Sequence, residues 1–495
     1  MKNKGLSILI SLVLVGSIFV LATMMQVQAP SGTLNLSNNA AFSGLPKIAV
    51  NGDTVHVVWV DEELGVGNTE IFYKRSLNNG VGFEGTINVS NTEGSSVDAQ
   101  IAENGEFVFI VWVEDEDEFL VSDGITDIMF SRSIDNGATF ESPVALSSSS
   151  VDAFAPKIAA TSSALSIVWR DTISGDDEIQ YRRSTDNGAT FDPSLVSDPL
   201  NISDTVIAGS SINPRVAMYG GNVYVAWADN FSGNDEIYLR KSTDFGATFT
   251  PAPGSDPVTV SNSPAGDSII PEMAISASTN SPSLIVHVVW LDNDPAFGGG
   301  GNDVVVYGRS MDNGVNFNTA EQEVLSDTLN DSSDPRIGVS GDVVSAVWRE
   351  SLGGFNEIFY NRSIDDGATF LSAELENISG TALFDSLAPE LFVFATNVFV
   401  MYKDNSPGDF DIFIKRSIND GEDFGLAVNI SNSSGTSDFG EVASTSSFHS
   451  VYGVYRDNTD GDPDVYILNA VLPLAVQAFM TDSAGNDLNS FDSVI

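Results

Sequence analysis

The chain of 495 residues has no cysteine and only three histidines, and its 21 lysines and arginines stand against 68 aspartates and glutamates. The lack of cysteine excludes disulfide bonds, thiolate metal sites and thiol nucleophiles. The formal net charge of −47 argues against nucleic acid and anionic membrane surfaces as partners, because phosphate groups require a basic surface. No H-E-x-x-H, G-x-S-x-G or P-loop motif is present.

Long apolar runs are also missing, with one exception at the start of the chain. An apolar run over residues 6–22 follows two lysines, and Val27-Gln28-Ala29 has the pattern of a signal-peptidase site. Residues 1–29 are therefore predicted to be a signal peptide. An uncleaved N-terminal anchor is the alternative, since Pro30 disfavours cleavage and 17 apolar residues approach the length of a membrane span. Both alternatives predict a secreted or cell-surface protein.

One phrase occurs eight times: an apolar residue, Trp or Tyr, any residue, then Asp or Glu. The aromatic residues recur every 53 to 63 positions, at Trp59, Trp112, Trp169, Trp227, Trp290, Trp348, Tyr402 and Tyr455. Each period holds four short segments rich in β-branched and aromatic residues, separated by Gly, Asp and Ser. Repeats of this length and content predict an all-β fold, an eight-bladed β-propeller of four-stranded blades.

A second phrase, S-x-D-x-G-x-T-F or a close variant, lies between the third and fourth segments, and we call it the box turn. Its Asp can accept N–H groups of its own turn, its Gly supplies a positive φ, and its Phe is expected to pack the hairpin onto its own blade. The box turns are residues 76–83, 133–140, 184–191, 242–249, 310–317, 363–370 and 417–424. Because there are only seven, a seven-bladed ring is the alternative.

The box turn resembles the Asp box of the bacterial neuraminidase repeat, which is found in sialidase-like β-propellers. The resemblance covers about residues 34–470, and Asn78 and Asn419 replace the Asp in two copies. It implies the propeller fold. Activity in that family requires three arginines that grip the substrate carboxylate, a Tyr nucleophile activated by a Glu, and an Asp that serves as acid and base. The family's early Arg-Ile-Pro phrase is missing here, where the corresponding stretch is Leu45-Pro46-Lys47-Ile48.

The two ends of the repeat region complete each other. Residues 34–37 match the fourth-segment phrase although no blade precedes them, whereas the eighth repeat has three strand segments and no box turn. The N-terminal segment is therefore predicted to form the outer strand of the last blade, which removes an open sheet edge. The propeller domain then spans residues 30–470. The tail, residues 471–495, is either the start of a further β domain or a disordered extension.

Beyond the leader, all 19 basic residues fall into columns of the repeat. The largest column adjoins the box turns and is predicted to be framework. Two smaller columns supply the candidate binding residues: Lys47, Lys157, Arg215 and Arg336 after the Pro of the first segment, and Arg170, Arg349 and Arg456 after the Trp or Tyr. The first segment is innermost in a propeller, so its column forms a ring: Lys47, Gln100, Lys157, Arg215, Glu272, Arg336, Glu390 and Glu441. Mutual ion pairing and a polar binding site or pore at the axis are both open interpretations.

Acidic, Gly-containing loops join the second and third segments. Such oxygen-rich loops are candidates for binding Ca²⁺, although they lack EF-hand spacing. The alternative is that their acids cap the turns of solvated hairpins. The candidate ligands are Asp171, Asp176, Glu178, Asp229, Asp235, Glu236, Asp404, Asp409, Asp411, Asp457, Asp462 and Asp464.

Repetition explains the basic residues and the tryptophans, whereas an active site should break the repeat with residues found once. We therefore predict no catalytic residue and a non-catalytic exported β-propeller that binds an extracellular glycan, a peptide or an envelope protein. One alternative is a sialidase-type exo-glycoside hydrolase. Another is a structural cell-envelope component that self-associates through its acidic loops. Nine N-x-(Ser/Thr) sequons fit an exported chain that could be glycosylated, but five of them lie in the fourth segments and are better explained as strand-edge residues: Asn35, Asn88, Asn201, Asn377 and Asn429.

Overall fold

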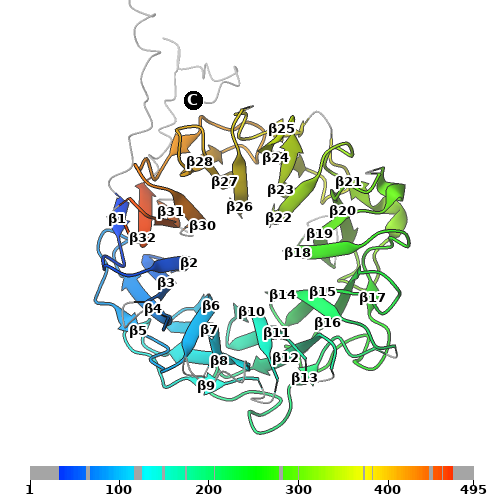
Figure 1. Cartoon of the computed structure of the whole chain (residues 1–495). Helices are drawn as coiled ribbons and strands as arrows, with labels where there is room; N and C mark the ends of the chain where they lie inside the picture. Colours follow the sequence, from blue (N-terminus) through cyan, green and yellow to red (C-terminus); the bar gives the residue numbers. More distant parts are fainter. Residues whose placement is uncertain are drawn as a thin grey trace, which may run out of the picture.

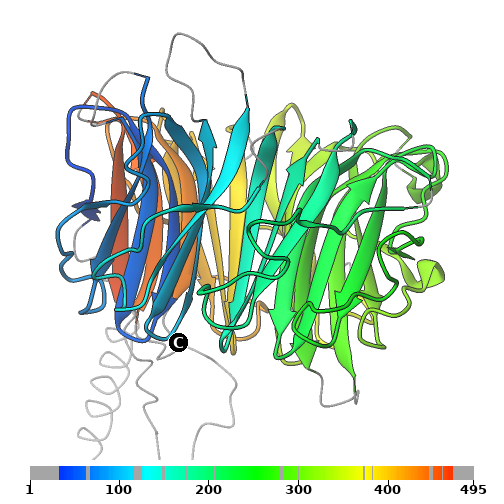
Figure 2. The ribbon, with the colours of Figure 1, turned by 90° about the horizontal axis from the view of Figure 1, so that it is seen from below.

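The structure, a computed structural model, describes residues 33–471 except 63–66, 116–124, 148–150, 173–174, 206, 278–282, 299, 372–373, 382, 445–449 and 460. These residues form eight four-stranded antiparallel sheets arranged as the blades of a ring (Figure 1). Viewed from the side, the strands run from one face of the ring to the other (Figure 2). The predicted eight-bladed propeller is confirmed, and the seven-bladed alternative is wrong. The predicted leader and the tail beyond Val471 lie outside the described residues.

The four strand positions of a blade run from the axis outward. The first strands are β2 (Ser43–Asn51), β6 (Ser95–Asn104), β10 (Ala153–Thr161), β14 (Ser211–Tyr219), β18 (Ser268–Ala277), β22 (Ser332–Ser340), β26 (Ser386–Phe394) and β30 (Ser437–Ser444). The second strands are β3 (Thr54–Asp61), β7 (Phe107–Asp115), β11 (Ala164–Asp171), β15 (Asn222–Asp229), β19 (Leu284–Asp292), β23 (Val343–Leu352), β27 (Asn397–Asp404) and β31 (Ser450–Asp457).

The outer two positions are a long and a very short strand. The third strands are β4 (Glu70–Ser76), β8 (Thr126–Ser133), β12 (Glu178–Ser184), β16 (Glu236–Ser242), β20 (Val304–Ser310), β24 (Phe355–Ser363), β28 (Asp411–Ser417) and β32 (Asp464–Val471). The fourth strands are β5 (Ile87–Asn88), β9 (Val144–Ala145), β13 (Leu200–Asn201), β17 (Val258–Thr259), β21 (Glu323–Val324), β25 (Glu376–Asn377), β29 (Val428–Asn429) and, in blade 8, β1 (Thr33–Asn35). The described 3₁₀ turns include η1 (Pro295–Phe297) and η2 (Thr319–Glu321), and no helix in the described part has the length and apolar character needed to cross a membrane.

The N-terminal strand closes the ring as predicted. Strand β1 pairs antiparallel with β32, with Leu34 opposite Ile467. The next residue but one, Leu36, is 1% exposed and packs in the core between blades 8 and 1 together with Trp59 and Val454. The last blade is therefore built from both ends of the repeat region.

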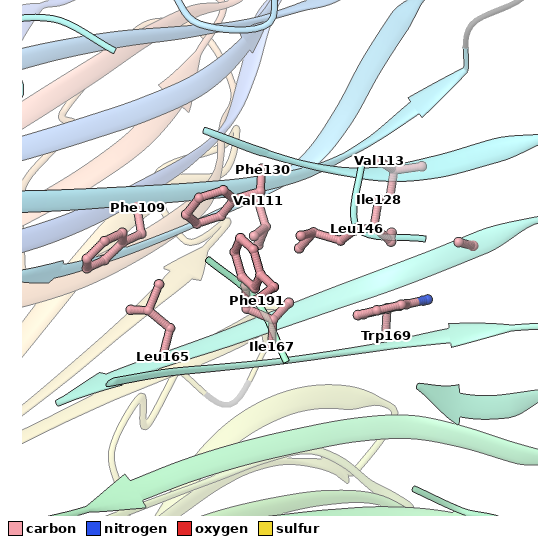
Figure 3. Packing of buried hydrophobic residues seen from close by; sticks show 11 residues of the cluster. Phe109, Val111, Val113, Ile128, Phe130, Leu146, Leu165, Ile167, Trp169 and Phe191 are labelled. Carbon is pink, nitrogen blue, oxygen red and sulfur yellow. The ribbon is translucent and has the colours of Figure 1, made fainter. Parts of the chain in front are cut away.

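The core consists of apolar layers between neighbouring blades. Figure 3 shows one of them, in which Phe109 and Phe130 of blade 2 face Leu165 and Trp169 of blade 3. Second strands are buried on both faces, which explains why they read as continuous apolar runs. The recurring carboxylate also has a structural role, since residues two apart lie on the same face of a strand. The Trp112 indole N–H donates to Glu114 at 2.8 Å, as does the Ser96 hydroxyl at 2.6 Å.

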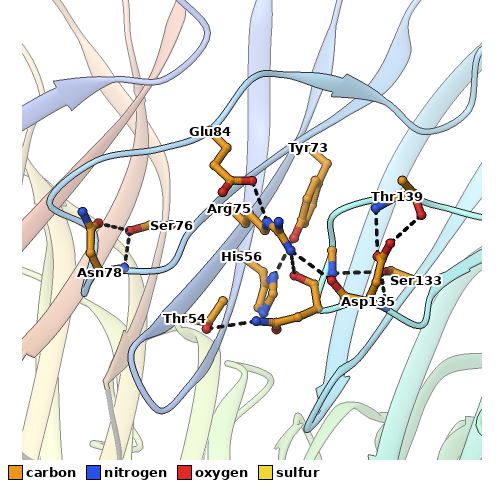
Figure 4. A network of polar contacts seen from close by, with 12 residues as sticks. Thr54, His56, Tyr73, Arg75, Ser76, Asn78, Glu84, Ser133, Asp135 and Thr139 are labelled. Atoms are coloured by element: carbon orange, nitrogen blue, oxygen red, sulfur yellow. Dashed lines mark hydrogen bonds and ion pairs between the residues drawn. The ribbon is translucent and has the colours of Figure 1, made fainter.

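The box turns join neighbouring blades (Figure 4). In blade 2, Asp135 accepts hydrogen bonds from Ser133 and Thr139, which outweigh its slight desolvation and lower its pKa to about 2. Gly137 has φ 78°, and a Cβ at this position would clash with the Tyr73 hydroxyl of blade 1. Phe140 packs edge-on against the same Tyr73, with ring centroids 4.8 Å apart. Phe140 lies in a core cluster that contains Val108 and Ile110 of its own blade as well as Tyr73, so the hairpin is also fixed to the preceding blade, which the sequence did not predict.

Candidate functional site

The innermost column forms a ring around the axis of the propeller, which we call the axial ring: Lys47, Gln100, Lys157, Arg215, Glu272, Arg336, Glu390 and Glu441. Each member is the first residue after an irregularity in the pairing of its first strand with the second, for example between Phe154 and Lys157 in β10. The same shift precedes the ring residue in all eight blades. The shared register explains why one sequence column occupies one level of the ring.

The backbone of these bulges is strained in a repeated way. Two residues before the ring position, seven blades have a non-glycine residue with φ between 49° and 55°: Leu45, Asp98, Ala155, Asn213, Ile270, Asp334 and Ala388. Side chains such as Ala and Ile rarely adopt this left-handed region, which costs of order 1 kcal/mol or more per residue. Bulges re-aim the residue that follows them. The strained backbone therefore lies two residues before each ring residue, in the bulge that orients its side chain.

Most of the charged ring residues are paired with one another. Glu272 contacts Arg215 at 2.6 Å and Arg336 at 3.7 Å, and Arg336 contacts Glu390 at 3.0 Å. On the other side, Lys47 Nζ lies 3.7 Å from Glu441. The side chains in these pairs are 19% to 34% exposed, so solvent reaches the ring. The pairs run from blade 4 to blade 7 and from blade 8 to blade 1.

The pKa values of the paired ring residues reflect both the pairing and the burial of the charges. Glu441 raises the pKa of Lys47, while burial raises the pKa of Glu441 itself despite the nearby ammonium. The two directions differ because Glu390 favours the ammonium of Lys47 but repels the carboxylate of Glu441. Partial desolvation raises the pKa of Glu272, but its two arginine partners outweigh this and hold the pKa below the usual range.

The remaining arc of the ring, in blades 2 and 3, consists of Gln100 and Lys157. The Lys157 ammonium donates to the carbonyl of Pro156 at 3.2 Å, and no carboxylate in the described part of the chain lies within 4.0 Å of it. Burial lowers the pKa of Lys157 to about 8. The amide of Gln100 donates to Asp98 at 3.0 Å. In blades 4 to 8 and blade 1, each charged residue of the axial ring thus has an ion-pair partner. The arc in blades 2 and 3 has none within the described part of the chain.

The arginines of the other predicted binding column pair with acids that are not members of the axial ring. Arg170 contacts Asp177 at 3.6 Å, Arg349 contacts Asp334 at 3.2 Å and Arg456 contacts Asp438 at 3.3 Å. These arginines belong to blades 3, 6 and 8, and each pairs with an acid of its own blade. They do not form a shared cluster. Their partners Asp334 and Asp438 were missed by the sequence analysis, although both stand close before the ring residue in their first strands.

The acids proposed as calcium ligands fall into two groups. Those at the ends of the loops are buried or half-buried and bonded within the blade: Asp404, for example, accepts from the hydroxyls of Ser386 and Thr381, and Glu236 accepts from Ser261. Those within the loops are exposed, as at Asp176, or half-buried. No group of three or more His, Asp or Glu side chains suited to a metal ion occurs among the described residues. Calcium binding stays a prediction.

The fourth-strand sequons have a structural use. In blade 7 the side-chain Oδ1 of Asn429 accepts the backbone N–H of Asn432 at 2.7 Å, and the Ser431 hydroxyl donates to Asp411 at 2.7 Å. The same residue types make the same bonds at Asn35 and Ser37 in blade 8. The recurrence of these sequons is thus explained by turn and strand chemistry, whatever their modification.

No protein-family model and no curated protein matches the chain. Solved structures do resemble it. They include the Hadza microbial sialidase Hz136 (12% identity, 62% of this chain and 63% of that chain covered, TM-score 0.39), Trypanosoma rangeli sialidase in complex with sialic acid (9%, 91% and 92%, 0.39) and the polysaccharide lyase Uly1 (10%, 84% and 95%, 0.47). The match to Hz136 spans less than two thirds of that protein. Identities and TM-scores this low carry no argument about the activity of this chain.

Proposed function

We propose that this protein is a non-catalytic β-propeller, secreted or held at the cell surface, that binds a glycan or protein ligand through its axial ring. One observation carries the proposal. The Trp phrases and box turns repeat their bonds from blade to blade and hold the fold together, whereas the axial ring changes from Lys to Gln, Arg or Glu while its backbone stays the same. Variation at a fixed, solvent-accessible position is what a specific ligand requires.

The arginine geometry supports a binding function over hydrolysis. A sialidase-type site needs three arginines that converge on one carboxylate, but Arg170, Arg349 and Arg456 are each neutralised by a different acid. In the ring, Arg215 and Arg336 share Glu272 and are likewise neutralised. Polar groups that are already paired suit reversible contacts with hydroxyl and amide groups.

The test has a binding arm and a catalytic arm. The purified protein is screened on glycan and peptide arrays, and hits are remeasured with Gln100→Ala and with the matched control Lys241→Ala, which lies on outer strand β16. We expect at least tenfold weaker binding for Gln100→Ala and unchanged binding for the control. In the catalytic arm, no product is expected from a fluorogenic sialoside. Release of product that Arg215→Ala or Arg336→Ala abolishes would overturn the proposal in favour of the sialidase alternative.

A further inference from the structure

The chain contains six Asn-Gly pairs, the sequence that deamidates most readily, because a glycine nitrogen can attack the side-chain carbonyl carbon of the asparagine before it without steric hindrance. Four pairs lie in box turns: Asn79-Gly80, Asn136-Gly137, Asn187-Gly188 and Asn313-Gly314. The other two lie in the hairpins that join a first strand to a second, at the ends of β2 and β6: Asn51-Gly52 and Asn104-Gly105. We propose that the two hairpin pairs are sites of spontaneous deamidation and that the box turn protects the other four.

The box turn holds the glycine nitrogen out of this reaction. In blade 2, Gly137 is buried and its N–H donates to the Ser133 hydroxyl at 2.8 Å. The other three turns have the same bond from a buried glycine to the serine four residues earlier, at 2.8 or 2.9 Å. A hydroxyl is a weak base, so it keeps the proton on the nitrogen. Attack on the asparagine therefore requires that a buried hydrogen bond is broken first.

The glycines of the two hairpin pairs have different surroundings. Gly52 and Gly105 are exposed, and the space that a Cβ would occupy is open at both. The residue four positions before each of them is an isoleucine, Ile48 or Ile101, which has no hydroxyl to hold the N–H. Exposed turns of this kind can adopt the geometry in which the nitrogen reaches the Cγ of the preceding asparagine.

A carboxylate lies beside both hairpins. The Asn51 amide donates to the Gly105 carbonyl at 3.1 Å, so the hairpins of blades 1 and 2 are in contact. Burial raises the pKa of Glu103, and hydrogen bonds from the Gly105 N–H and the Asn51 side chain oppose this in part. The Oε2 atom of Glu103 is buried and has no hydrogen-bond partner in the described part of the chain. Glu103 is therefore placed to accept the proton that the Gly105 nitrogen loses.

The reaction needs only water. The deprotonated glycine nitrogen attacks the asparagine Cγ, ammonia leaves with the proton, and a cyclic succinimide remains. Water then opens the ring at either carbonyl to give aspartate or isoaspartate, so each event adds one negative charge. At Asn51 the product loses the N–H groups that contact Gly105 and adds a second carboxylate beside Glu103. Deamidation should therefore weaken the contact between blades 1 and 2, whatever ligand the propeller binds.

The experiment compares all six pairs within one sample. The intact protein is aged at pH 8, and peptide mass mapping gives the rate at which each asparagine becomes aspartate or isoaspartate. We expect Asn51 and Asn104 to react at least about tenfold faster than any box-turn asparagine, because only the box turns must first break a buried hydrogen bond. Equal rates at the six pairs in the unaltered protein would overturn the proposal without reliance on any variant.

Two variants separate protection from assistance. Ser133→Ala removes the acceptor in one box turn, so Asn136 should react about tenfold faster while the asparagines of the other three box turns stay slow. Ser133→Thr keeps the hydroxyl and should leave Asn136 slow. Glu103→Gln should slow Asn104 several-fold and leave the box turns unchanged. An unchanged rate at Asn136 in a folded Ser133→Ala variant would overturn the protective role of the serine, and an unchanged rate at Asn104 in Glu103→Gln would overturn the role of Glu103.

Discussion

Blades 7 and 8 have the same outer strand but obtain it differently. In blade 7, Asn429 and Ser431 bond to Asp411 from 18 and 20 residues away, each at 2.7 Å. In blade 8 the same bonds run from Asn35 and Ser37 to Asp464, at 2.7 and 2.6 Å, across 429 and 427 residues. The same Asn and Ser hydrogen bonds thus have different consequences in the two blades. In blade 7 it completes a sheet, and in blade 8 it also holds the two ends of the repeat region together.

Removing the closing strand β1 should have the largest effect on the stability of the fold. A chain that begins at Asn39 loses the buried Leu36, the Ser37–Asp464 bond and the pairing of β1 with β32. We expect the free energy of unfolding to fall by more than about 5 kcal/mol, from a core side chain and several hydrogen bonds together. Urea unfolding compares this chain with one that begins at Thr33. The same midpoint for both would mean that β1 does not close the ring.

Single core substitutions sharpen the comparison. Leu36→Ala in blade 8 and Ile430→Ala in blade 7 each truncate a side chain that is at most 3% exposed, at equivalent positions. Each should cost about 2 to 5 kcal/mol. Only Leu36→Ala should also speed amide exchange along β32, because its strand can detach from a chain end. Equal exchange along β28 in Ile430→Ala would break the proposed difference between the blades.

The serine hydroxyls provide a smaller, closely matched pair. Ser37 accepts the N–H of Val465 and donates to Asp464, and Ser431 does the same for Ile412 and Asp411. Ser37→Ala and Ser431→Ala should each cost about 1 to 3 kcal/mol, since a buried N–H and carboxylate lose a partner. Thermal unfolding measures both. A cost confined to Ser431→Ala would show that the closing strand is already detached in solution.

The smallest expected effect on stability concerns the interfaces of blade 7 with blades 6 and 8. Arg362 of blade 6 donates to the Asp420 carbonyl in the box turn of blade 7 at 3.0 Å, but blade 8 has no box turn, and Arg416 of blade 7 donates to Asn397 of its own blade at 2.6 Å. Arg362→Ala should therefore cost about 2 kcal/mol, and Arg416→Ala about 1 kcal/mol. The difference in urea midpoint checks this. Equal losses of stability in the two variants would mean that the box turn contributes little to the interface between blades.

The repeat made the architecture predictable, because a missing fourth strand in repeat eight and a spare one at residues 34–37 have one simple solution. It also placed Lys47, Lys157, Arg215 and Arg336 in one ring. The contact of each box turn with the preceding blade was not predictable, because a perfect repeat looks the same whichever neighbour its Phe meets. The bulges were missed for another reason. Leu45 and Ile270 are residues that sequence rules place in extended backbone, and only the surrounding fold imposes their positive φ.

The closing strand also delays completion of the ring during synthesis, because β1 cannot pair until β32 has been made. Strand β1 emerges from the ribosome first, yet its partner Asp464 follows 429 residues after Asn35. At about 5 to 20 residues per second, the segment waits roughly 20 to 90 seconds for its sheet. Throughout that interval Leu36 has no pocket and the growing row of blades has two open edges. Newly made chains are thus most exposed to wrong pairing with one another just before the last blade is complete.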